Sequence, residues 1–343
     1  VTLLESCKNK HDFQTGVMMR FLENLESATT SGITSSGIDG VDSGKAYTYI
    51  SNHRDIVLDA SFINLCFLRK GIKTSEVAIG DNLLIYDWIT HLVKLNGSFI
   101  VKRNLPTRQA LDAAKQLSGY IHHAVTEKCE SIWIAQRQGR AKDSSDHTQE
   151  SVIKMLALGG DKTSLVERLM ELNITPTAIS YEYDPNDYLK AREFLARRRD
   201  PEFKKSQRDD LFSMETGILQ FKGCVHFAIG HNLNSQLSEM LGMTDKVEIV
   251  RRVCSLIDKE IHSGYHIYPI NYIAYDELNK TDRFSSEYTT TDVDKFDEYI
   301  NRQLDKVDLP DITEEERAFM RQQILIMYSN PLHNKLLATG QES

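Results

Sequence analysis

The segment Tyr49-Ile50-Ser51-Asn52-His53-Arg54-Asp55-Ile56-Val57-Leu58-Asp59 passes from a short apolar run into a helical pattern within a few residues. Around it, short β-type runs alternate with longer helical ones as far as about residue 230, and the chain beyond residue 232 is mainly helical. Such alternation is typical of a sheet with helices on its faces. We therefore expect an α/β fold with a mixed central sheet flanked by helices, and helical additions at both ends.

The expected elements follow from the periodicity of apolar residues. An amphipathic helix over 11–27 precedes a Gly/Ser/Thr-rich loop over 29–45. We therefore expect the chain to be divided into an N-terminal helix and loop (1–44), an α/β core (45–231) and a mainly helical C-terminal region (232–343). We expect strands at 46–50, 76–79, 98–102, 131–135, 174–183 and 221–229, and helices at 58–69, 83–94, 107–128 and 149–158.

Composition narrows the class of protein. The 343 residues are 41% hydrophobic and 26% charged, as in a globular chain, and the net charge of −8 argues against a general nucleic-acid binder. The five cysteines are widely separated and form no Cys-x-x-Cys pair, which favours a reducing compartment over a disulfide framework or a zinc site. No window approaches the roughly 18–20 apolar residues that span a bilayer. We expect a cytoplasmic protein with peripheral contact on the inner face of the cell membrane.

His53 directly follows a predicted strand, and the ends of strands are where open α/β sheets bind ligands. Imidazole titrates near neutral pH, so a histidine can remove a proton from a hydroxyl group while a nearby carboxylate orients the ring and stabilises its cation. Asp55 and Asp59 are both close enough in sequence to supply that carboxylate. An Asp at the start of a helix is also an ordinary cap, so either residue has a structural alternative.

Two later segments carry cations at the ends of predicted strands. Leu95-Asn96-Gly97-Ser98-Phe99-Ile100-Val101-Lys102-Arg103 has a glycine, a short apolar run and a terminal arginine. The segment 132–142, Ile-Trp-Ile-Ala-Gln-Arg-Gln-Gly-Arg-Ala-Lys, runs from a buried-type strand into a glycine turn and a cluster of cations. Strand ends would bring Arg103 and Arg140 to the same rim as His53.

With these segments in order, the chain resembles the glycerol-3-phosphate and 1-acylglycerol-3-phosphate (lysophosphatidate) acyltransferase family over residues 45–185. The resemblance implies that His53 is the general base, that the following Asp is its partner, and that Arg103 and Arg140 hold the phosphate of the acceptor. It rests on four blocks: His53 and the Asp after it; Gly97, Phe99, Ile100 and Arg103; Gly139 and Arg140; and Pro176 in an apolar strand.

The chain departs from the family pattern in two places. Four residues normally separate the histidine and the aspartate, whereas five separate His53 from Asp59 and one separates it from Asp55. We favour Asp59, because it lies within the incoming helix while Asp55 is well placed to cap it. Gln138 replaces the usual Glu before the glycine, and Arg140 comes one position early, which makes Lys142 an alternative to it.

The resemblance implies transfer of a fatty acyl group from acyl-CoA or acyl carrier protein to the hydroxyl of a glycerol-phosphate acceptor, preferably 1-acyl-sn-glycerol 3-phosphate, in phospholipid synthesis. We expect direct attack of that hydroxyl on the thioester, because no Gly-x-Ser-x-Gly nucleophile motif is present. No metal and no redox cofactor are expected. The alternatives are an acyltransferase for another lipid acceptor and a non-catalytic homologue that binds lipid or carrier.

A charged helical stretch over 187–217 contains Arg197, Arg198, Arg199, Lys204 and Lys205. Such a cluster is consistent with a solvated helix face. It is also consistent with a docking patch for anionic lipid headgroups or an acidic carrier, in a chain whose overall charge repels both.

Overall fold

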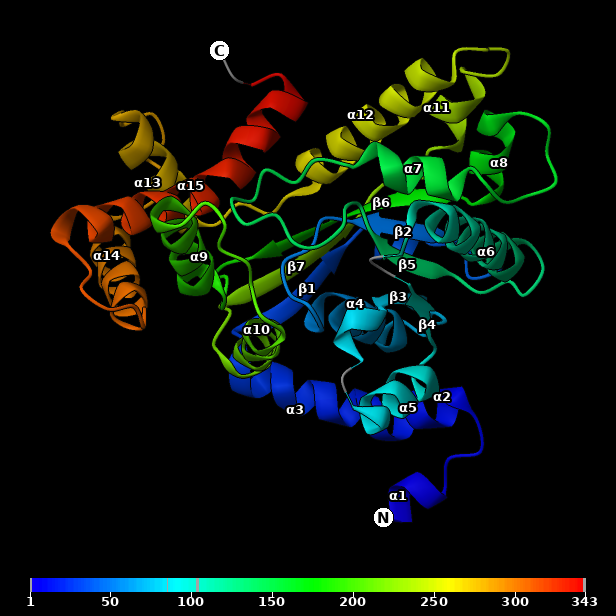
Figure 1. Cartoon of the computed structure of the whole chain (residues 1–343), viewed down its shortest axis with the longest axis horizontal. Coiled ribbons are helices and arrows are strands. Elements are labelled where there is room, and N and C mark those ends of the chain that lie inside the picture. Colours follow the sequence, from blue (N-terminus) through cyan, green and yellow to red (C-terminus); the bar gives the residue numbers. More distant parts are fainter. Residues whose placement is uncertain (1, 85, 103–104, 342–343) are drawn as a thin grey trace.

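A seven-stranded sheet forms the centre of the structure, a computed structural model that describes residues 2–84, 86–102 and 105–341 (Figure 1). Its strands are β1 (Gly32–Ser36), β2 (Thr48–Ser51), β3 (Glu76–Gly80), β4 (Ser98–Val101), β5 (Ile132–Ala135), β6 (Ile174–Tyr181) and β7 (Cys224–Ile229). The strand order is β1-β7-β6-β2-β5-β3-β4. β6 and β7 are antiparallel, and every other neighbouring pair is parallel. The expected α/β fold with a mixed sheet is confirmed.

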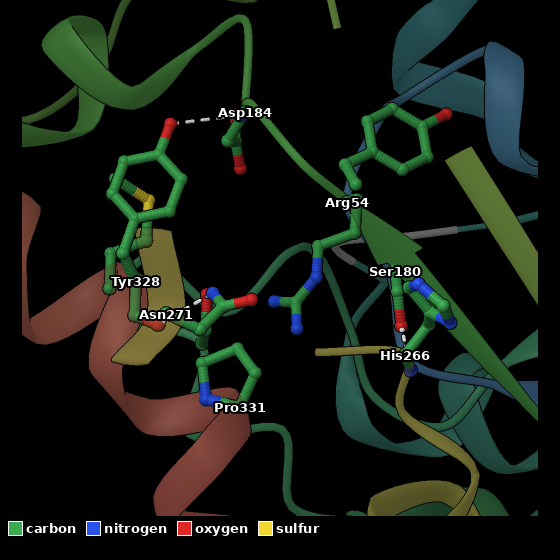
Figure 2. Close-up of a pocket in the computed structure, with 10 residues that line it drawn as sticks. Arg54, Ser180, Asp184, His266, Asn271, Tyr328 and Pro331 are labelled. Carbon is green, nitrogen blue, oxygen red and sulfur yellow. Dashed lines mark hydrogen bonds between the residues drawn. The ribbon is translucent and has the colours of Figure 1, made fainter. Parts of the chain in front are cut away.

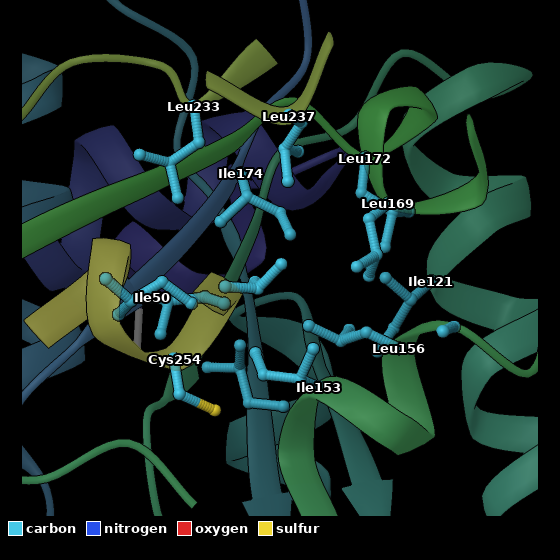
Figure 3. Close-up of a cluster of buried hydrophobic side chains, with 14 of the residues drawn as sticks. Ile50, Ile121, Ile153, Leu156, Leu169, Leu172, Ile174, Leu233, Leu237 and Cys254 are labelled. Carbon is cyan, nitrogen blue, oxygen red and sulfur yellow. The ribbon is translucent and has the colours of Figure 1, made fainter. Parts of the chain in front are cut away.

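One face of the sheet is covered by helices from the middle and the later part of the chain (Figure 1). These helices are α6 (Thr107–Thr126), α7 (Glu150–Leu156), α8 (Leu165–Glu171), α11 (Asn234–Ser238) and α12 (Lys246–Gly264). Figure 3 shows how Ile50 and Ile174 from the strands meet Ile121, Leu156 and Cys254 from the helices. Burial of these apolar side chains is the main force that holds this layer to the sheet.

The opposite face packs against helices from the first part of the chain and against α10 (Gln207–Leu219) (Figure 1). Tyr49, Trp133 and Phe227 of the sheet are buried with Phe62 and Phe67 of α4. The helices of this part are α1 (Thr2–Glu5), α2 (Lys10–Phe13), a π-helical turn (Gln14–Met18), α3 (Met19–Thr29), α4 (Leu58–Arg69) and α5 (Asp87–Leu95), with short 3-10 turns at Ile38–Gly40 and Asp81–Leu83.

A third apolar cluster lies beside the sheet, among α9 (Asp187–Arg199), α13 (Pro269–Asn279), α14 (Thr290–Asp305) and α15 (Glu314–Thr339). It contains Leu195 of α9 together with Phe296 and Ile324 of the later helices. The predicted C-terminal region therefore packs against α9 from the predicted core and, through α12, against the sheet. The division at residues 44 and 231 stays a prediction.

The structure corrects two expectations. The stretch 29–45, expected to be a loop, contains β1, which pairs in parallel with β7 from Gly32 opposite Cys224 to Ser36 opposite Ala228. Strand formation depends strongly on the available partner, and a polar Gly-Ile-Thr-Ser-Ser segment gives little sign of it. The helix expected from residue 83 begins at Asp87. Among the described helices, none is both long enough and apolar enough to cross a membrane.

Candidate active site

His53 lies in the turn between β2 and α4, at the carboxyl end of a central strand. Its Nδ1 is 2.7 Å from Oδ2 of Asp59, a fully buried residue in the first turn of α4. The same oxygen accepts hydrogen bonds from the backbone N–H groups of Arg54 (2.7 Å) and Asp55 (3.1 Å). A carboxylate in its ionised form only accepts hydrogen bonds, so with such a partner this contact requires the hydrogen on Nδ1 and leaves Nε2 as the basic nitrogen.

Asp55 makes a different set of contacts. Its Oδ1 accepts hydrogen bonds from the backbone N–H groups of Val57 (2.9 Å) and Leu58 (2.8 Å), which cap the start of α4. Burial, followed by the nearby charge of Asp59, raises the pKa of Asp55. The carboxylate in contact with His53 is thus the one that the sequence favours, although its catalytic role remains a proposal.

A polar cavity of about 600 Å³ opens beside His53 and the loop after β5. Five cationic side chains and three carboxylates line it, so the cavity attracts anions in a chain of net charge −8. We call it the cationic pocket. Its charged lining residues are Arg137, Arg140, Lys142, Lys190, Lys205, Asp143, Glu193 and Asp210.

The cations of this pocket differ in how firmly they are held. Glu193 pairs with Lys142 and, at 3.2 Å, with Lys205. Lys190 pairs with Asp184 at 2.5 Å, and both side chains are almost fully buried. Arg140 donates from Nη1 to Asn186 at 3.2 Å when that amide is oriented to satisfy its neighbours. The pocket therefore combines fixed charges from the β5 loop with charges from α9 and the segment after it.

The residues that the resemblance assigns to acceptor binding are only partly brought together. Gln138, Gly139 and Arg140 line the cationic pocket, whereas Arg103 lies outside the described residues. Gly97 precedes β4, so it is at the strand end opposite to that of the His53 turn. The structure therefore does not bring Gly97 to the pocket.

Phe99 is also away from the cationic pocket. Its ring centroid is 5.1 Å from that of Tyr120 on α6, and it lines a separate apolar groove. Because Phe99 belongs to the short edge strand β4, its side chain packs between the sheet and α6. A role for it in binding the polar part of an acceptor is not supported by this position.

Sequence reasoning missed Arg137 and Lys190 as residues of the cationic pocket. Arg137 lines the cationic pocket, the apolar cavity described next and the groove beside Phe99. Within the described part of the chain, its buried Nε has no hydrogen-bond partner. Its place as the first cation after β5 is a sequence feature that indicates a residue of the site. No such feature marks Lys190, because it lies more than 50 residues further along the chain.

An apolar cavity of about 270 Å³ lies on the other side of His53, between the sheet, α4 and α5. His53, Ile56, Leu83, Arg137 and Gly139 line both this cavity and the cationic pocket. The cavity continues over apolar side chains that include Val77, Ile79, Trp88, Ile89, Leu92, Val93, Trp133, Met214 and Ile218. The imidazole thus lies where a charged compartment meets an apolar one.

Arg54, the neighbour of His53, points into a small polar cavity that the C-terminal helices close (Figure 2). Its Nη2 is 2.7 Å from Oδ2 of Asp146, and both side chains are almost fully buried. The hydroxyl of Tyr265 donates to the same oxygen at 2.7 Å. Arg54 therefore ties the His53 turn to the segment around Asp146 and does not line the cationic pocket.

The arginines of the charged stretch are engaged in ion pairs. Arg198 lies 2.7 Å from Glu315, and Arg199 lies 2.7 Å from Glu316 at the start of α15. Arg197 lies 3.1 Å from Glu193. The pairs of Arg198 and Arg199 hold α9 to α15, and the pair of Arg197 lies within α9. They favour a structural role over a patch with free charges for lipid.

Comparisons with known proteins give a fold-level likeness. No protein-family model matches the sequence, and the search of curated proteins finds no match. Among solved structures, the chain is similar to the 1-acyl-sn-glycerophosphate (LPA) acyltransferase PlsC from Thermotoga maritima, with 10% sequence identity over 74% of this chain and 81% of that one, and a TM-score of 0.42. A likeness at this level carries no argument about the activity of this chain.

Proposed function

We propose that the chain is an acyltransferase that moves a fatty acyl group from a thioester to the hydroxyl of a glycerol-phosphate acceptor, preferably 1-acyl-sn-glycerol 3-phosphate. One observation carries the proposal: His53, hydrogen-bonded to buried Asp59, lies where the cationic pocket meets the apolar cavity. A reaction between a phosphate-bearing alcohol and a fatty thioester needs these two environments on either side of a base. The blocks that contain His53 and Gly139-Arg140 support the same assignment, since these residues line the cationic pocket.

In the proposed reaction, the acyl chain of the donor occupies the apolar cavity and the phosphate of the acceptor occupies the cationic pocket. Nε2 of His53 takes the proton of the acceptor hydroxyl as its oxygen attacks the thioester carbonyl. The negative charge of Asp59 stabilises the imidazolium that forms. Collapse of the tetrahedral intermediate breaks the C–S bond and leaves an ester. The departing thiolate takes the proton back from His53.

Arg137 and Arg140 are the described arginines best placed to bind the phosphate. A guanidinium group can donate two parallel hydrogen bonds to phosphate oxygens, and the unpaired Nε of Arg137 is a donor without a protein partner among the described residues. Arg103 and Lys142 remain proposed contributors. We further propose acyl-CoA or acyl carrier protein as the donor, and a cytoplasmic protein in peripheral contact with the membrane that supplies the acceptor.

The test is an assay of free thiol release from acyl-CoA by the purified full chain, with glycerol 3-phosphate, with 1-acyl-sn-glycerol 3-phosphate and with no acceptor. We expect release to depend on the acceptor and to fall about 10²–10⁴-fold in His53→Ala. His123→Ala is the matched control, because this histidine is exposed on α6 and pairs only with Glu127 in the described structure.

Near-unchanged turnover in a folded His53→Ala protein would exclude the general-base mechanism. If neither acceptor produces thiol release, the result would favour a non-catalytic, lipid-binding protein. Release with a different hydroxylated lipid would favour the alternative acceptor class, which the uncharged Gln138 in the cationic pocket makes worth including in the assay.

A further inference from the structure

A second apolar groove, of about 540 Å³, lies between β4, α6 and α7. We infer that it binds the acyl chain of the proposed monoacyl acceptor; the inference rests on the proposed function. We call this site the α6 groove. Its apolar lining includes Phe99, Ile100, Ala113, Ala114, Leu117 and Met155.

The α6 groove and the apolar cavity lie on opposite faces of the sheet. Phe99, Leu117 and Met155 pack against the cluster beneath α6 and α7, whereas Ile79 packs against the cluster beneath α4. One continuous chain in the cavity would therefore not fill the groove. The protein offers two separate apolar sites, as a reaction between a fatty thioester and a lipid acceptor requires.

Both apolar sites reach the cationic pocket. The α6 groove shares Arg137 and Gln138 with it, and the apolar cavity shares Arg137 and His53. A phosphate held by Arg137 would therefore have apolar surface available on either side. Glycerol 3-phosphate has no chain and would leave the groove empty.

The groove exists because α6 presents small side chains toward the edge strand. Ala113 and Ala114 leave space that larger residues would fill, and Ile100 on β4 is 37% exposed. Exposed apolar surface in a groove of ligand size is unfavourable unless something covers it. A single acyl chain attached to a headgroup in the neighbouring pocket fits this shape and this polarity.

Titration calorimetry tests the inference without relying on transfer. The ligands are glycerol 3-phosphate and its 1-hexanoyl, 1-octanoyl and 1-decanoyl esters, each below its micelle concentration. We expect the Kd to fall about fourfold for each added methylene, the equivalent of about 0.8 kcal/mol. Ala114→Trp, which fills the groove, should remove most of this dependence and leave the Kd of glycerol 3-phosphate unchanged.

Two further variants serve as an alternative groove substitution and as a control. Ala110→Trp fills the more exposed part of the same groove, in case Ala114→Trp does not fold. Lys115→Trp adds the same side chain at an exposed neighbouring position that does not line the groove, so its chain-length dependence should match that of the unchanged protein. Melting curves of all three variants establish that they are folded.

The outcomes separate the inference from the proposed function. A chain-length dependence that survives both groove substitutions, or no binding of any ester, overturns the inference. If the Kd loses its dependence on chain length in Val93→Trp and keeps it in the groove variants, the acceptor chain lies in the apolar cavity. Binding to neutral phosphatidylcholine vesicles that weakens in Ala114→Trp would make the groove a membrane contact and also overturn it. Normal ester binding without thiol release would leave the groove assignment intact and refute the transferase.

Discussion

The exchange of Asp for Asn at two positions of the His53 turn tests the proposed catalytic pair. In Asp59→Asn the amide oxygen can still accept the hydrogen bonds of Arg54 N and Asp55 N, so the turn should persist. The loss is the negative charge 2.7 Å from His53 Nδ1, which stabilises the imidazolium. General-base catalysis is worth about 10²–10⁴-fold, so kcat/KM should fall by that factor, an increase of about 2.7–5.4 kcal/mol in the barrier.

Asp55→Asn is the matched control, with the same chemical change on the same turn. Its amide oxygen can keep both caps on α4, since Asn caps helices about as well as Asp. The raised pKa of Asp55 also means that burial already disfavours its charge. We expect kcat/KM and the melting temperature to stay close to those of the unchanged protein. An Asp55→Asn loss equal to that of Asp59→Asn, or full activity in both, would refute the pair.

Three further outcomes concern stability. Arg54→Ala removes the buried positive charge that faces Asp146 and leaves that carboxylate with only the hydroxyl of Tyr265 as a partner among those described above, so urea unfolding should show a loss of about 3–5 kcal/mol, and an unchanged midpoint would contradict the ion pair. The pKa of His226 is lowered to about 4, mainly by burial. As the pH falls below the ordinary histidine pKa of about 6.5, the unfolded chain therefore binds more protons than the folded protein does. Stability should therefore drop between pH 7 and pH 5, and less so in His226→Gln; equal slopes of melting temperature against pH would exclude this. A Cβ at Gly217 would lie 1.8 Å from Oδ2 of Asp55, so Gly217→Ala should destabilise by about 1–3 kcal/mol, whereas Gly119→Ala, with nothing within 4 Å, should be neutral or stabilising in the same melts.

The fold class was predictable because it depends on local periodicity. The helix expected at 58–69 is α4, with the same bounds, and six of the seven strands lie where apolar runs predict them. The exception is β1, whose polar residues become a strand only because the exposed edge of β7 supplies backbone partners. β7 is far from β1 in the sequence, so no local pattern around β1 indicates that a pairing partner is available.

For the site, the sequence by itself determined that a histidine follows a central strand, that two aspartates stand near it, and that cations end the later strand. Only the tertiary structure decided which aspartate contacts His53. Both aspartates are close to His53 in sequence, so the distance from each carboxylate to the imidazole depends on the direction in which α4 leaves the turn. The tertiary structure also brought Lys190 and Lys205 from α9 and the segment after it to the loop of Arg137. Compartments of opposite polarity on either side of one imidazole arise from long-range packing, which local sequence patterns do not encode.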